Sequence, residues 1–155
     1  MESALRFPIE RIELDIRQAS DGTIVLVHDD DVIIDGQKVP IENATTEQLR
    51  EVLLDFMTFE EALAVIDKRM PVMIDLKKGN FVPELVALIE RNGIAETAMI
   101  SCTDPWAIRQ LRAAFPSMPI GLSTGHRPLG LALKRGGPVV RNAAGLDRRR
   151  CSRLR

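Results

Sequence analysis

The chain has 155 residues, of which 45% are hydrophobic and 28% are charged. This composition fits one globular domain with its own core and leaves little length for a second domain. The sequence contains no apolar run close to the ~20 residues that a membrane-spanning helix needs, and its first residues contain no apolar stretch of the kind found in signal peptides. We therefore expect no membrane span and a cytoplasmic location.

The formal net charge of −1 is unevenly distributed along the chain. Residues 127–155 contain nine basic residues and one acid, which leaves residues 1–126 with a net charge of −9. The basic segment has no aromatic residue and no amphipathic period, so we predict a solvated or poorly ordered Gly/Arg-rich tail and no nucleic-acid partner. Binding of nucleic acid or of an anionic surface through this tail is the weaker hypothesis.

The two cysteines give no sign of a zinc site. Cys102 and Cys151 lack the spacing of zinc ligands and have no histidine pair nearby. We predict that Cys102 is a buried thiol and that Cys151 belongs to the tail.

The first predicted elements are two strands joined by a turn. Residues 11–17 alternate apolar and charged side chains with a period of two, which is typical of a strand. Residues 20–22 have the composition of a turn, and the β-branched segment 23–27 predicts a second strand. The polar segment 29–43 predicts a loop or a small hairpin.

The middle of the chain predicts two helices and a strand. Residues 46–54 have helical spacing of their apolar positions, and residues 59–68 follow a capping box over 58–61. Residues 71–77 are mostly apolar, which is typical of a strand in a sheet that is covered on both faces.

The remaining elements continue this alternation. Helices are predicted over residues 81–92, where Gly93 can end the helix in a left-handed conformation, and over residues 105–115. Short strands are predicted over 97–101 and 118–122. The order of the elements indicates α/β architecture with a parallel sheet.

A small set of polar residues lies at or near the carboxyl ends of the predicted strands. Glu13 and Asp15 share one face of their strand, and two carboxylates that close repel each other unless a cation such as Mg²⁺ or Ca²⁺ lies between them. Asp75 and Lys77 repeat the spacing, and His28 is suited to proton transfer near neutral pH. Sites in α/β folds form at this end of the strands, although a solvated strand face would also explain the two acids.

Several short motifs, taken in order, resemble the glycerophosphodiester phosphodiesterase family. Residues 12–17 and 20–29 are similar to its E-x-D pair, D-G turn and H-D pair, and residues 73–77 are similar to its I-E-I-K strand. The resemblance covers residues 9–125 and implies a (β/α)₈ TIM-type barrel, of which this chain holds a part over residues 1–126.

The resemblance also implies roles for individual residues. Glu13, Asp15 and Asp75 would hold one divalent cation, Mg²⁺ or Ca²⁺. His28 would be one of the family's two acid/base histidines, and Lys77 would lie near the substrate phosphate. The implied reaction is the hydrolysis of a small-molecule glycerophosphodiester to glycerol 3-phosphate and an alcohol.

Three departures from the family pattern bear on the expected activity. The family's H-R-G segment is absent before Glu13, Asp75 stands in place of a glutamate, and the chain is shorter than the ~250 residues of a closed barrel. We therefore expect a partial barrel with weak or no turnover, and the alternative is a non-catalytic remnant or binding module. Open strand edges would favour a homo-oligomer. No role is predicted for His126, which lies beyond the matched segment.

Overall fold

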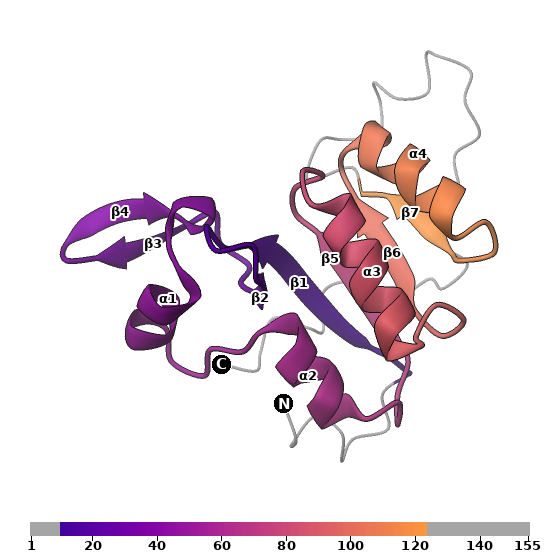
Figure 1. Ribbon diagram of the computed structural model, residues 1–155, viewed down its shortest axis with the longest axis horizontal. Helices are drawn as coiled ribbons and strands as arrows, with labels where there is room; N and C mark the ends of the chain where they lie inside the picture. The colour runs from indigo at the N-terminus through magenta and orange to yellow at the C-terminus, as the bar shows by residue number, and fades with distance from the viewer. Residues whose placement is uncertain (1–9, 124–155) are drawn as a thin grey trace, which may run out of the picture. The chain divides into compact units, whose positions relative to one another are not determined.

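A five-stranded sheet with the strand order β2–β1–β5–β6–β7 organises the molecule (Figure 1). In the computed structural model, which describes residues 10–123, four strands are parallel neighbours. They are β1 (Ile12–Gln18), β5 (Val72–Leu76), β6 (Met99–Cys102) and β7 (Ile120–Leu122). The predicted tail, His126 and Cys151 lie outside the described residues.

The strand β2 (Ile24–Leu26) departs from the parallel arrangement, because it pairs antiparallel with β1. A tight turn connects the two strands, and Gly22 adopts a left-handed φ of 85° there. A parallel pair would need a crossover connection of a dozen or more residues, so this short turn permits only the antiparallel pairing. The predicted parallel sheet is thus present in four strands and carries one antiparallel edge strand.

The segment predicted as a loop or small hairpin forms a hairpin. Strands β3 (Asp31–Ile34) and β4 (Gln37–Pro40) pair antiparallel, and Asp35 and Gly36 both have positive φ, at 51° and 75°. Two positive φ values in a two-residue loop suit the twist of a hairpin. A short 3₁₀ turn, Ile41–Asn43, leads on to α1 (Thr46–Val52).

The hairpin and α1 have a small apolar core of their own. Its largest buried side chains come from β2, β3, the 3₁₀ turn and α1, and they are Val25, Val32, Ile41 and Leu49. Burial of such a side chain stabilises the fold by about 1.5–3 kcal/mol. This cluster anchors the hairpin beside β1 and β2.

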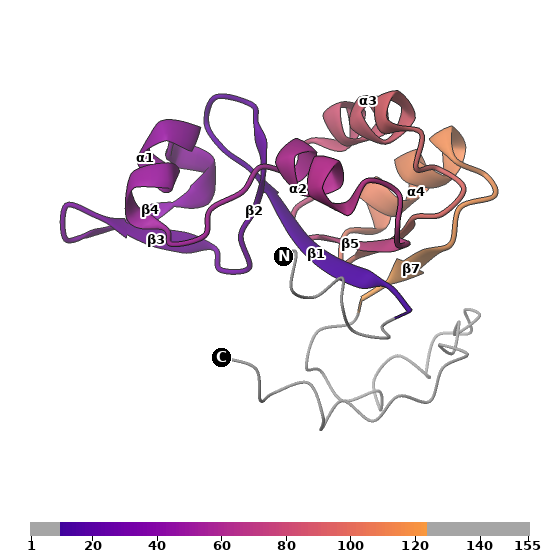
Figure 2. The same ribbon diagram turned by 90° about the horizontal axis from the view of Figure 1, so that it is seen from below.

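Three helices cover one face of the sheet: α2 (Phe59–Ile66), α3 (Val82–Asn92) and α4 (Pro105–Ala114). Figure 2 shows them along one side of the strands. Their apolar stripes and the alternate apolar positions of the strands form the main core, which includes Leu14, Ile74, Ile100, Phe59, Leu85 and Leu111. Cys102 is also fully buried in this core, as predicted, and burial raises the pKa of its thiol.

The helix boundaries follow local signals. Thr58 Oγ1 accepts a hydrogen bond from the backbone amide of Glu61 at 3.1 Å, and Glu61 Oε2 accepts one from the amide of Thr58 at 2.8 Å. This is the predicted capping box. Helix α2 ends at Ile66, two residues earlier than predicted, because Asp67 and Lys68 both have positive φ. Gly93 ends α3 with a φ of 60°, as predicted.

The opposite face of β1 and β5 carries polar side chains at alternate positions. Glu13, Asp15 and Arg17 lie on this face in β1, and Asp75 lies on it in β5. The apolar side chains in between belong to the core under the helices. Within residues 10–123, no helix combines the length and the apolar character needed to cross a bilayer.

Candidate metal centre

The three carboxylates predicted as ligands meet on the polar face of the sheet. Asp15 of β1 and Asp75 of β5 are direct partners in the parallel register, and directly paired residues of neighbouring strands point to the same face. Glu13 precedes Asp15 by two residues and therefore shares that face. One carboxylate oxygen from each residue lies within 4.8 Å of the other two.

The ammonium of Lys77 lies between two of these acids. Its Nζ is 2.7 Å from Oδ1 of Asp15 and 2.7 Å from Oδ2 of Asp75, and its side chain is 19% exposed. Partial burial acts to lower the pKa of Lys77, but the hydrogen bonds and the charges of Asp15 and Asp75 outweigh it and raise the pKa above its ordinary value. Lys77 therefore stays protonated at neutral pH and offsets one of the three negative charges.

The oxygen donors fit a hard divalent cation. Mg²⁺ and Ca²⁺ prefer carboxylate oxygens at about 2.0–2.6 Å, so ligand oxygens around one ion are separated by at most about twice that distance. One oxygen each of Glu13, Asp15 and Asp75 lies within 4.8 Å of the other two, and this spacing is about twice the ~2.4 Å of a Ca²⁺–oxygen bond but exceeds twice the ~2.1 Å of a Mg²⁺–oxygen bond. The formal charges of the three carboxylates and the ammonium of Lys77 sum to −2. The oxygen spacing also shows that Asp75 reaches the other two carboxylates, although its side chain is one methylene shorter than that of glutamate.

Ser101 is a member of the site that the sequence did not reveal. It lies on β6 in direct register with Asp75, and its Oγ donates a hydrogen bond to Oδ1 of Asp75 at 3.0 Å. A serine in a short apolar strand carries no signal of this role, because only the register of β5 and β6 brings the two side chains together.

His28 lies just beyond β2, beside the middle of β1. The amide of Val27 donates to the carbonyl of Asp15 at 3.2 Å, which brings the segment that carries His28 next to a predicted metal ligand. The imidazole is 73% exposed, and its Nδ1 lies 2.9 Å from Oδ1 of Asp29. The hydrogen bond and the charge of His28 lower the pKa of Asp29.

Arg17 fixes the backbone of this segment. Its side chain is 8% exposed, and its Nη2 lies 2.9 Å from the carbonyl oxygen of His28 and 2.7 Å from Oδ1 of Asp30. Its Nε also donates to the same carbonyl at 3.3 Å. Arg17 stands two residues after Asp15 on the polar face, so the strand that carries two predicted ligands also holds the loop of His28.

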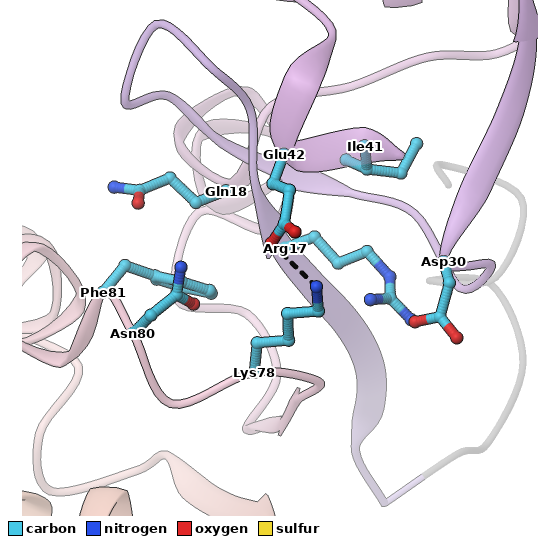
Figure 3. Close-up of a pocket in the computed structure, with 8 residues that line it drawn as sticks. All are labelled: Arg17, Gln18, Asp30, Ile41, Glu42, Lys78, Asn80 and Phe81. Carbon is cyan, nitrogen blue, oxygen red and sulfur yellow. Dashed lines mark hydrogen bonds and ion pairs between the residues drawn. The ribbon is translucent and has the colours of Figure 1, made fainter. Parts of the chain in front are cut away.

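A small hollow adjoins Arg17 at the carboxyl end of the strands. Figure 3 shows the Arg17 guanidinium against Asp30 and the ammonium of Lys78 next to Glu42. The Lys78 Nζ lies 2.7 Å from Oε2 of Glu42. The other residues around it are Gln18, Ile41, Asn80 and Phe81. Its volume of about 10 Å³ corresponds to about one water molecule, so this hollow by itself does not accommodate an organic substrate.

Comparisons with known proteins agree on one family. The family model described as "Glycerophosphoryl diester phosphodiesterase family" matches residues 1–132. A search of curated proteins gave no significant match.

Solved structures of glycerophosphodiester phosphodiesterases share the fold. One from Parabacteroides distasonis is similar with a TM-score of 0.69 and 19% identity over 78% of this chain and 55% of that chain. One from Thermotoga maritima is similar with a TM-score of 0.66 and 20% identity over 85% of this chain and 57% of that chain. A glycerophosphodiester phosphodiesterase from Agrobacterium tumefaciens is similar with a TM-score of 0.66 and 19% identity over 77% of this chain and 56% of that chain.

This chain thus spans little more than half of the length of these structures. The observed sheet and its helices correspond to part of a TIM-type barrel, as the sequence predicted. The family model covers most of the chain, and the order of strands and helices agrees with that match. The chain therefore belongs to the glycerophosphoryl diester phosphodiesterase family.

Proposed function

We propose that this chain carries a metal-dependent phosphodiesterase site that hydrolyses small-molecule glycerophosphodiesters to glycerol 3-phosphate and an alcohol. The observation that supports this function is the convergence of the Glu13, Asp15 and Asp75 carboxylates within 4.8 Å. Family membership supports the reaction class. The substrate class and the roles of individual residues are part of the proposal.

In the proposed site, Glu13, Asp15 and Asp75 hold one divalent cation, Mg²⁺ or Ca²⁺. A bound divalent cation would supply Lewis-acid polarisation of a phosphoryl oxygen. The ammonium of Lys77, which contacts Asp15 and Asp75 at 2.7 Å, lies close enough to donate charge-assisted hydrogen bonds to a neighbouring phosphate oxygen.

His28 serves as the proton donor to the leaving alcohol. Its imidazole is 73% exposed and is therefore accessible to a substrate. Histidine is the side chain that most often acts as a general acid or base in enzymes. The two hydrogen bonds from Arg17 to the His28 carbonyl hold the backbone that presents this ring.

A second candidate function is a metal-binding module without turnover. Residues 10–123 contain a single histidine, whereas the resemblance implies two acid/base histidines. Loss of one acid/base group typically lowers the rate by ~10²–10⁴-fold. This candidate shares the metal ligands with the first one, so only turnover separates them.

The deciding experiment measures glycerol 3-phosphate released from a panel of glycerophosphodiesters that differ in their alcohol, with Mg²⁺, with Ca²⁺ and with EDTA. For the proposed enzyme we expect release that EDTA abolishes, that His28→Ala lowers by ~10²-fold or more, and that Asp15→Asn removes. Asp55→Asn is the matched control, because Asp55 is an exposed aspartate in the loop between α1 and α2.

Metal binding is measured in parallel by isothermal titration calorimetry. Binding that Asp15→Asn abolishes, without release of glycerol 3-phosphate from any substrate, would favour the binding module. Unchanged metal affinity and unchanged hydrolysis in Asp15→Asn would refute the proposed site altogether.

A further inference from the structure

Three strands place one polar side chain each in a single row across the sheet. Asp15 of β1 pairs with Asp75 of β5, and Asp75 pairs in turn with Ser101 of β6. Within β6, Ile100 and Cys102 point into the core under the helices and are fully buried, whereas Ser101 is partly exposed on the polar face. The serine hydroxyl therefore lies where the Asp75 carboxylate can reach it.

The carboxylate of Asp75 is held at both of its oxygens. Ser101 Oγ donates to Oδ1 at 3.0 Å, and Lys77 Nζ lies 2.7 Å from Oδ2. An ionised carboxylate only accepts hydrogen bonds, so the hydroxyl is the donor. Asp75 is 17% exposed, and hydrogen bonds are stronger in such a partly desolvated place than in water. The two contacts together fix the plane of the carboxylate.

The orientation decides which oxygen faces the other acids. Since Oδ1 is engaged by the β6 hydroxyl, Oδ2 is the oxygen directed toward Asp15, where the Lys77 ammonium bridges the two carboxylates. We propose that Ser101 is a positioning residue that holds Asp75 in the rotamer in which Oδ2 is presented to the divalent cation. The inference rests on the proposed metal site and adds a residue from a third strand to it.

Groups that orient a metal ligand typically change metal affinity or activity by ~10–100-fold when they are removed. We therefore expect Ser101→Ala to raise the dissociation constant for Mg²⁺ or Ca²⁺ by ~10-fold or more. Ser101→Thr keeps a hydroxyl at the same place and should restore an affinity close to that of the wild type. Thr103→Val is the matched control, since it removes an exposed hydroxyl two residues further along.

The test is a calorimetric titration of each full-length variant with Mg²⁺ and, separately, with Ca²⁺, together with thermal melts in EDTA. A purely structural role of Ser101 would lower the melting temperature in EDTA in Ser101→Ala and leave the dissociation constant unchanged. A positioning role weakens metal binding in Ser101→Ala and leaves it intact in Ser101→Thr and in Thr103→Val. If Ser101→Ala does not fold, Ser101→Cys replaces it, because a thiol is a weak donor of similar shape.

The outcomes separate this inference from the proposed function. Equal metal affinity in Ser101→Ala and the wild type, with binding still abolished in Asp15→Asn, would overturn the role of Ser101 and leave the metal site standing. A wild-type chain that binds neither cation would overturn the metal site, and the role of Ser101 with it.

Discussion

Replacement of Lys77 by methionine is expected to change two properties in opposite directions. Lys77→Met keeps the length of the side chain and removes the ammonium that lies 2.7 Å from both Asp15 and Asp75. Hydrogen bonds to charged groups contribute about 1.5–3 kcal/mol. Because these side chains are only 17–30% exposed, we expect the metal-free variant to lose about 2 kcal/mol of stability.

The affinity for a divalent cation should rise in the same variant. Two unit charges about 4 Å apart interact by about 1 kcal/mol in water, so a divalent cation near the cluster meets about 2 kcal/mol of repulsion from the ammonium. Removal of that repulsion corresponds to a dissociation constant roughly 10–30-fold lower. Hydrolysis should nevertheless fall, because Lys77 is proposed to contact the substrate phosphate.

The assay is a thermal melt of wild type and Lys77→Met in EDTA and across a Mg²⁺ or Ca²⁺ titration, with calorimetric dissociation constants. Lys78→Met is the matched control, because Lys78 pairs with Glu42 at a place where both side chains are about half exposed, and it should change neither property much. A Lys77→Met variant that binds the cation equally or more weakly would refute the placement of the cation beside this ammonium.

Two further predictions concern the scaffold. Partial desolvation acts to raise the pKa of Asp21, but hydrogen bonds from Thr46 and a nearby amide outweigh it and lower the pKa to about 2 from 3.8. Asp21→Ala should lower the free energy of unfolding by about 1 kcal/mol at pH 7, a value reduced because Asp21 is largely exposed to solvent. In urea melts, the difference in stability between the wild type and the variant should be fully present above pH ~4 and disappear as the pH falls through ~2. A difference that persists at pH 1.5 would contradict this linkage. Gly79→Ala should lower stability by about 1–3 kcal/mol, because a Cβ there would lie 2.2 Å from Oδ2 of Asp104, the N-cap of α4. Gly121→Ala, where a Cβ meets nothing within 4 Å, is the control, and equal melting temperatures for the two variants would refute the clash.

Local patterns in the sequence were sufficient for most of the fold. The period-two alternation of β1 and the three-to-four spacing of the helices specify which face of each element is apolar. Caps are also local: the Thr58–Glu61 box and the left-handed Gly93 involve residues a few positions apart. These elements therefore appear within one or two residues of their predicted bounds.

Pairing between strands could not be predicted with the same certainty. The antiparallel direction of β2 follows from the short turn at Gly22, and the hairpin of β3 and β4 depends on the positive φ of Asp35 and Gly36. Several conformations of a polar segment satisfy the same composition, and packing of its apolar side chains against α1 selects one of them.

The order of residues alone placed Glu13 and Asp15 on one face of a strand, and the resemblance of the short motifs to the family added Asp75 as the third predicted ligand. Only the tertiary structure decided how they meet. The parallel register sets Asp15 beside Asp75 and Asp75 beside Ser101, and a shift of one residue would turn each side chain to the other face. The bridging contact of Lys77 with Asp15, the hydrogen bond from Ser101 to Asp75 and the hydrogen bond from Arg17 to the His28 carbonyl join residues from separate segments of the chain. Such contacts depend on three-dimensional proximity, which sequence spacing does not contain.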